Sequence, residues 1–119
     1  MAISIAARKQ KGRKLQQVVR DSILKLFPEL TERDVRSTPM GVSGEDVQLS
    51  AKAAELFPYA VEAKCHEKLN IWSALEEAEG NNRDLEPLLV FKRNRSEIYA
   101  VVSFKHFMKL LKELREKNG

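Results

Sequence analysis

The sequence predicts a single α/β domain, with a mixed central β-sheet flanked by helices. Two observations support this fold class. Segments with strand-like alternation are interleaved with segments whose apolar residues recur every three or four positions. The chain has 119 residues, of which 43% are hydrophobic and 32% charged, which suits one folded domain with one core. No apolar run approaches the ~20 residues of a membrane span.

The N-terminal region is expected to be a flexible basic arm over residues 1–11, followed by the domain over residues 12–119. A helix is predicted from about Gly12 to Phe27 by its apolar spacing, and Pro28 ends it. The elements expected next are a turn at Thr31–Asp34, an extended piece at Val35–Thr38, a strand at Glu45–Leu49 and a helix at Ala51–Leu56 capped by Ser50.

The second half contains the clearest strand, Tyr59–Cys65, whose residues alternate between two faces. A helix capped by Asn70 should run to about Glu79. The remaining expected elements are a hairpin of Leu88–Lys92 and Ile98–Val102, a turn at Asn81–Asn82 and a closing helix capped by Ser103.

The net charge of +4 conceals a segregated pattern. Cations dominate before Asp21 and from Lys92 onward, whereas acids outnumber cations between Glu45 and Glu86. Basic ends around an acidic centre suit a polyanion held by its phosphates over a metal-binding core. Solvated helix faces are the alternative interpretation. The single cysteine, Cys65, excludes an internal disulfide, so a reducing, cytoplasmic setting is the default expectation.

Three side chains carry the chemistry that we expect. Glu62 and Lys64 are two residues apart on a strand and therefore share a face. Asp46 lies on the polar face of the preceding predicted strand, which would bring two carboxylates and an ammonium together if the strands are neighbours. Close carboxylates repel unless a cation lies between them, and Mg²⁺ prefers such oxygen ligands. The Ala63 carbonyl is a further possible ligand, and a surface ion pair of Glu62 with Lys64 is the alternative.

Four segments in order give the chain a resemblance to a known family. They are KGRKLQQ (Lys11–Gln17), VRS (Val35–Ser37), SGEDVQLS (Ser43–Ser50) and VEAK (Val61–Lys64). Together they resemble the PD-(D/E)XK nuclease superfamily and, within it, the archaeal-type Holliday junction resolvases and similar small phage nucleases. The resemblance covers roughly residues 11–102.

The resemblance implies a restriction-endonuclease-like core and a metal-dependent endodeoxyribonuclease acting on branched DNA as a homodimer, in a prokaryotic or phage-infected cell. Asp46 and Glu62 would bind Mg²⁺, with Mn²⁺ able to substitute, and Lys64 would be catalytic. Arg36 and Ser37 would lie near the scissile phosphate. The expected DNA contacts near the N-terminus are Lys11, Arg13 and Lys14.

The chain departs from the family at one position. Archaeal resolvases carry a metal-binding glutamate four residues after the glycine of the KG pair, and that position here is Gln16. An amide oxygen can coordinate a metal or bond to a metal-bound water, but it contributes no charge. We therefore keep Gln16 among the candidate catalytic residues.

Other residues have weaker signals. Lys9 in the arm, and Arg93 and Arg95 at the predicted hairpin tip, are candidate phosphate contacts, with a solvated turn as the alternative for the tip. We expect Glu45, His66 and His106 at the surface and Cys65 in the core. Trp72 suits the core, a base stack or a dimer interface. The closing helix has an apolar stripe that suits the core or a dimer surface: Phe104, Phe107, Met108, Leu111 and Leu114.

The leading hypothesis is therefore a Mg²⁺-dependent junction-resolving endonuclease. One alternative is a nuclease that acts on flaps, forks or plain duplex. Another is a DNA-binding module of the same fold with weakened catalysis, for which Gln16 is the sign.

Overall fold

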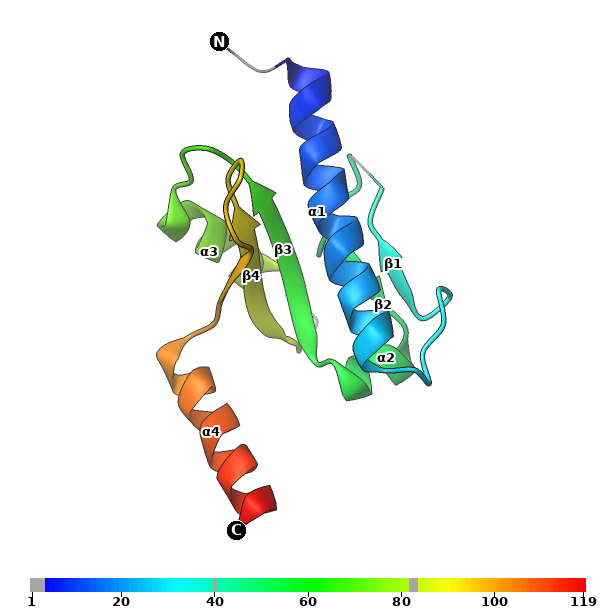
Figure 1. Ribbon diagram of the computed structural model, residues 1–119, viewed down its shortest axis with the longest axis vertical. Helices are drawn as coiled ribbons and strands as arrows, with labels where there is room; N and C mark the ends of the chain where they lie inside the picture. Colours follow the sequence, from blue (N-terminus) through cyan, green and yellow to red (C-terminus); the bar gives the residue numbers. More distant parts are fainter. Residues whose placement is uncertain (1–3, 40, 82–83) are drawn as a thin grey trace.

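The computed structural model describes residues 4–39, 41–81 and 84–119 (Figure 1). Its elements are, in order, α1 (Ile5–Leu26), β1 (Val35–Ser37), β2 (Val47–Leu49), α2 (Ala51–Leu56), β3 (Tyr59–Cys65), α3 (Ile71–Gly80), β4 (Glu86–Lys92), β5 (Tyr99–Val101) and α4 (Phe104–Asn118). The order of helices and strands agrees with the prediction, and the bounds of α2 and β3 are the predicted ones.

The strands form a mixed three-stranded sheet and a separate antiparallel pair. The larger sheet has the order β3-β4-β5, in which β3 and β4 are parallel and β4 and β5 antiparallel. The pair is β1 with β2. The expected α/β fold with a mixed sheet and helices is confirmed, but β1 and β2 pair apart from that sheet instead of joining one central sheet. The predicted strand from Glu45 shortens to β2, and only Asp46 reaches the edge of β3, where its N–H donates to the Val61 carbonyl at 2.8 Å.

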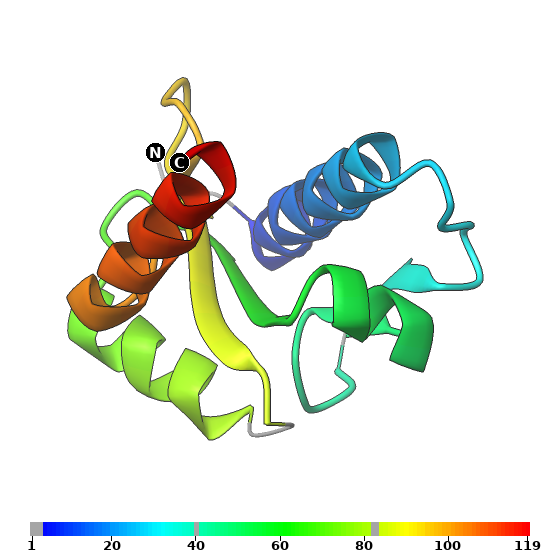
Figure 2. The same ribbon diagram turned by 90° about the horizontal axis from the view of Figure 1, so that it is seen from below.

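The core lies between α1 and the two sheets. Leu15, Val19 and Ile23 of α1 pack with the fully buried Val35, Val47 and Val61 from three different strands. Each such aliphatic side chain contributes about 1.5–3 kcal/mol through burial. Viewed from below, α1 and the β1–β2 pair lie on one half of the molecule, and α3 and α4 lie on the other (Figure 2).

Helix α1 begins earlier than predicted, so the arm expected over residues 1–11 is wrong for residues 5–11. Ser4 caps the helix, because its hydroxyl accepts a hydrogen bond from the Ala7 N–H at 3.1 Å. The residues that follow the cap are mostly strong helix formers, and they offset the roughly 1 kcal/mol cost of Gly12 inside a helix. Residues 1–3 lie outside the described part of the chain. The rest of the predicted basic arm is therefore the first two turns of a rigid element.

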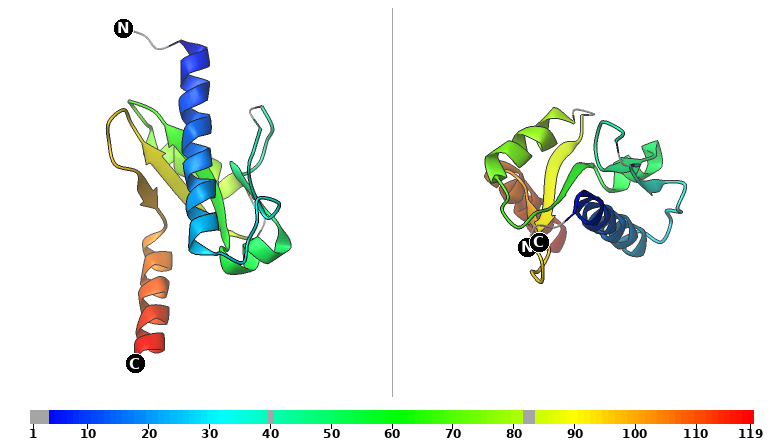
Figure 3. Two further views of the ribbon diagram at one scale, coloured as in Figure 1. Left: turned by 45° about the vertical axis from the view of Figure 1, so that its right-hand side comes forward. Right: turned by 90° about the horizontal axis from the view of Figure 1, so that it is seen from above.

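The closing helix does not pack in the core, which was the first of the two interpretations of its apolar stripe. Its stripe is not in a core: α4 has no buried residue, and Phe104 is 77% exposed. The helix projects beyond the end of the sheet (Figures 1 and 3). Trp72 at the start of α3 is also exposed, at 78%. The core interpretation of both features is therefore wrong.

Two polar residues expected at the surface are buried or nearly so. Glu45 is buried on the same side of its segment as Val47, because residues two apart in an extended chain face the same way. The side chain of His106 is 10% exposed, with its Nε2 2.7 Å from the Tyr59 hydroxyl and its Nδ1 3.4 Å from the Glu86 carboxylate. These contacts hold the first turn of α4 against the starts of β3 and β4. None of the helices in the described ranges combines the length and apolar character that crossing a membrane requires.

Candidate active site

The candidate site forms where Asp46 meets the free edge of β3. Gly44, with a φ of 105°, turns the chain just before this residue. The Asp46 N–H donates to the Val61 carbonyl at 2.8 Å, and the Ala63 N–H donates to Asp46 Oδ2 at 2.6 Å. Two hydrogen bonds, one from the backbone and one to the side chain, therefore fix the Asp46 carboxylate beside Glu62.

Glu62 and Lys64 share a face of β3, as the sequence predicts. Lys64 Nζ lies 3.5 Å from Glu62 Oε2 and 2.5 Å from Glu77 Oε2 on α3. The other oxygen of Glu62 accepts a hydrogen bond from Asn81 Nδ2 at 3.0 Å. Glu62 is only 8% exposed, so its carboxylate is held by partners on both sides with little help from water.

The predicted catalytic residues line one open hollow of about 680 Å³. Asp46, Glu62, Ala63 and Lys64 contribute from the β3 edge, and Gln16 contributes from α1. The cations that line the same hollow are Arg8, Lys9, Lys11 and Lys68. An acidic floor with a basic rim is the arrangement that would bring a phosphodiester to a cation-binding centre.

Burial raises the pKa values of both carboxylic acids. Burial is the main cause of the raised pKa of Glu62, which reaches about 7, with a further rise from the charge of Asp46 and an opposing effect of the Asn81 amide. Burial also raises the pKa of Asp46, against the Ala63 N–H, which lowers it. A pair of carboxylic acids that resists ionisation in this way is relieved by a bound cation.

Lys64 is held in its charged form. Burial alone would lower the pKa of this ammonium, but the hydrogen bond that Lys64 donates to Glu77 and the nearby charge of Glu62 outweigh burial, and the pKa is raised. Lys64 is therefore protonated near neutral pH. Its chemistry in this arrangement is to place a positive charge in the hollow rather than to accept a proton.

Gln16 is positioned as tightly as the carboxylates. It is 6% exposed, and its Oε1 accepts a hydrogen bond from the Ser37 hydroxyl at 2.8 Å. Gln16 thus lines the hollow of the carboxylates from α1. Ser37 reaches the site through this amide.

The residues of the hollow fit a hard divalent cation. Within the described ranges, no three side chains of histidine, cysteine, aspartate or glutamate are grouped so that they could hold a metal. Asp46 and Glu62 supply two carboxylates, and Gln16 supplies an amide oxygen. Because the N–H and C=O of a strand residue point to the same edge, the Ala63 carbonyl projects toward Asp46. Mg²⁺ suits such a set, since it binds through one or two carboxylates and keeps several waters.

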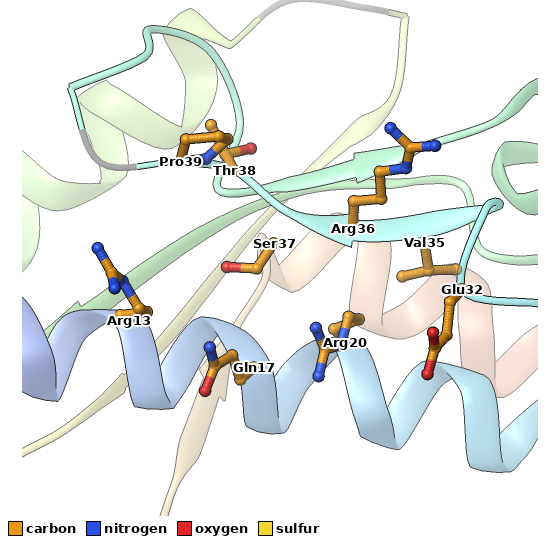
Figure 4. A pocket seen from close by; sticks show the side chains of 9 residues that line it. All are labelled: Arg13, Gln17, Arg20, Glu32, Val35, Arg36, Ser37, Thr38 and Pro39. Carbon is orange, nitrogen blue, oxygen red and sulfur yellow. The ribbon is translucent and has the colours of Figure 1, made fainter.

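The other DNA-binding candidates are distributed around this centre. Arg13 and Arg36 line a second hollow, of about 570 Å³, between α1 and β1, together with Arg20 and Ser37 (Figure 4). Arg36 projects from β1 away from α1 and does not line the hollow of the carboxylates. That Arg36 and Ser37 lie near the scissile phosphate stays a prediction. Lys14 is exposed and lines neither hollow.

The hairpin tip reaches the start of α1. Lys11 Nζ donates to Asn94 Oδ1 at 2.6 Å, and Asn94 lines the hollow of the carboxylates. Arg93 lines a separate surface hollow with His66, and Arg95 is exposed with a φ of 61°. The two arginines of the tip thus extend the basic surface. Of the three tip residues, Asn94 is the one that lines the hollow of the carboxylates.

Sequence reasoning gave no role to several residues of these surfaces. Among them are Asn81 and Glu77, which bond to the site, and Arg20 and Lys68, which line the hollows. Asn81 was interpreted only as a turn, and Glu77 only as an exposed helix acid. Pairing residues across a loop requires the fold, but Arg20 lies seven residues from Arg13 on α1, a helical spacing that marks one face.

Comparisons with family models, curated proteins and solved structures find no match to this chain.

Proposed function

We propose that this protein is a divalent-metal-dependent endodeoxyribonuclease that acts on branched DNA, of the kind that resolves four-way junctions. The observation that carries the proposal is the convergence of Asp46, Glu62, Lys64 and Gln16 on one hollow with a basic rim. The resemblance of the four sequence segments to PD-(D/E)XK nucleases supports the same assignment and implies that two copies cut symmetrically related strands.

Each residue has a distinct role in the proposed hydrolysis. Asp46 and Glu62 bind Mg²⁺, with the Ala63 carbonyl and Gln16 as further oxygen donors. The bound cation would neutralise charge on the phosphate and make water a better nucleophile near neutral pH. Lys64 stabilises the extra negative charge that builds on the phosphate oxygens as water attacks phosphorus. The bond from phosphorus to the 3′-oxygen breaks, leaving a 5′-phosphate and a 3′-hydroxyl.

The basic residues bind the substrate without reading its sequence. Arg8, Lys9 and Lys11 lie at the rim of the hollow, and Arg13 and Arg36 continue the positive surface along α1 and β1. Contacts of this type recognise the path of the phosphates, which differs between a junction and a straight duplex.

Cleavage of a labelled four-way junction in Mg²⁺, beside matched flap, fork and duplex substrates, tests this proposal. We expect Asp46→Asn and Lys64→Ala to reduce the single-turnover rate roughly 100-fold or more. Asp84→Asn and Lys25→Ala are matched controls, since both residues are exposed and line none of the hollows described above. If the protein prefers a flap or a duplex, that DNA replaces the four-way junction as the proposed substrate. Binding with no cleavage of any substrate would instead indicate the DNA-binding module.

A further inference from the structure

The exposed apolar stripe of α4 needs a covering surface. Phe104, Phe107, Met108, Leu111 and Leu114 recur every three or four residues and are 44–77% exposed. A helix of 15 residues is marginal in water on its own, and most of its stability has to come from packing of an apolar face. Within the described residues, α4 is attached to the domain chiefly through its first turn.

The anchor of α4 turns the stripe away from the sheet. His106 contacts Tyr59 and Glu86, and it lies two residues from Phe104, which is roughly 200° around the helix axis. The side of the helix that carries His106 therefore faces the domain. The stripe faces outward and is available to another surface.

We propose that a second copy of this chain covers the stripe, with α4 of each copy docked against α3 of the other. Both helices lie on the half of the molecule away from α1, so one surface carries both docking elements (Figure 2). A two-fold interface requires this arrangement, because each copy presents the same surface to its partner. The inference does not depend on the nuclease proposal.

Charge distinguishes a second copy from other occupants. α4 carries Lys105, Lys109, Lys112, Arg115 and Lys117 against two glutamates, Glu113 and Glu116. The exposed side of α3 is acidic: Glu76 and Glu79 follow the exposed Trp72 by four and seven residues, so the three share one face. Each chain therefore supplies both the basic and the acidic partner, and Trp72 offers a ring face to a cation of α4.

The size of the apolar surface agrees with a stable dimer. Taking about 150–250 Å² for a large side chain, the α4 stripe with Leu110 exposes roughly 600 Å² per copy. This value lies at the upper end of the largest patch on a typical monomer, which is about 300–600 Å². Two copies would bury roughly 1,200 Å² from the stripes alone, the lower bound for specific interfaces, before Trp72 is added.

The mass of the full chain in solution, measured by light scattering without DNA or metal, tests the interface. We expect twice the mass of one 13.6 kDa chain at tens of micromolar. Phe107→Glu with Leu111→Glu should give monomers with unchanged sheet signals in circular dichroism. Lys109→Glu, on the opposite side of α4 from the stripe, is the matched control and should remain dimeric. A monomeric parent, or a stripe variant that remains dimeric, overturns the proposal.

A charge exchange separates a specific interface from misfolding. Glu76→Lys with Glu79→Lys should weaken the dimer at least tenfold, and adding Lys105→Glu with Lys112→Glu should restore it. Failure of the second pair to restore association contradicts the docking of α4 on α3. A parent that stays monomeric and instead floats with vesicles of phosphatidylcholine and phosphatidylserine would assign the stripe to a lipid surface. Since no substrate is present, these outcomes are independent of whether the protein cuts DNA.

Discussion

The backbone N–H of Ala63 donates a hydrogen bond of 2.6 Å to the carboxylate of Asp46. Ala63 lies between Glu62 and Lys64, so this bond sets the carboxylate of a loop residue against both functional side chains of β3. The bond also stabilises the charged form of Asp46 in a site where burial opposes ionisation.

The stability of the metal-free protein should fall as pH rises through the titration of Glu62. The pKa of Glu62 is about 7 in the folded chain against an ordinary value of 4.5, so the folded state binds more protons between these values. The contribution of Glu62 to the free energy of unfolding is therefore fully present below pH 4.5 and is lost as pH rises through 7. Urea unfolding in EDTA at pH 5 and pH 8 measures the difference, which should shrink in Glu62→Gln.

Asp84→Asn is the control for that pH series, because Asp84 is exposed and an asparagine tolerates its φ of 58°. Its pH dependence should equal that of the parent. If Glu62→Gln also retains the full dependence, the raised pKa does not belong to this site.

Gln16→Glu should strengthen divalent-metal binding and weaken the metal-free protein. The substitution adds a third carboxylate to the hollow, and ligand charge is a main determinant of affinity for hard cations. We expect Mn²⁺ to bind on the order of tenfold more tightly, and the free energy of unfolding in EDTA to fall by about 1–3 kcal/mol because a buried charge lacks a full set of partners. Calorimetry and urea unfolding measure the two effects.

Gln17→Glu is the matched control, since Gln17 lines the second hollow with Arg13 and Arg20. It should leave Mn²⁺ affinity unchanged. Equal gains in the two variants would show that added negative charge anywhere on α1 is sufficient and that Gln16 has no special place.

The arginines of the second hollow should contribute salt-dependent affinity for DNA. Each phosphate contact that is lost lowers the slope of log K against log salt by roughly 0.9. Arg13→Ala and Arg36→Ala should each weaken junction binding and reduce this slope, whatever the sequence of the arms. Fluorescence anisotropy in EDTA across a NaCl series measures it. If the slopes of Arg13→Ala and Arg36→Ala equal that of Lys25→Ala, the DNA does not bind at the second hollow.

Glu77 should act as a positioning residue for Lys64. Lys64 donates a hydrogen bond to the Glu77 carboxylate, and this bond raises the pKa of the Lys64 ammonium. In Glu77→Gln that support is weakened, so the alkaline limb of the cleavage rate should move to lower pH. Glu55→Gln, on exposed α2, is the control. An unshifted alkaline limb in Glu77→Gln, with a lower rate at every pH, would indicate only structural damage.

The elements nearest the site are those that the sequence predicts best. The alternation of Tyr59–Cys65 gives both the bounds of β3 and the shared face of Glu62 and Lys64, because the two-residue period of a strand is local information. Ser50, Asn70 and Ser103 are likewise found as helix caps, since each accepts a hydrogen bond from an N–H three residues ahead.

The features that sequence reasoning missed depend on long-range packing. The spacing of Phe104 to Leu114 is the same for a helix that packs in its own core and for one that packs on a partner, so exposure of α4 could not be read from it. The bonds of Glu62 to Asn81 and of Lys64 to Glu77 connect β3 to α3, and no local pattern marks them.

The central claim is that Asp46 and Glu62 jointly hold one divalent cation. Calorimetric titration of the parent, Asp46→Asn, Glu62→Gln and Asp84→Asn with Mn²⁺ tests it most directly. We predict saturable binding to the parent and to Asp84→Asn, and at least tenfold weaker binding to each of the other two variants. Affinity in Asp46→Asn or Glu62→Gln equal to that of the parent would contradict the account.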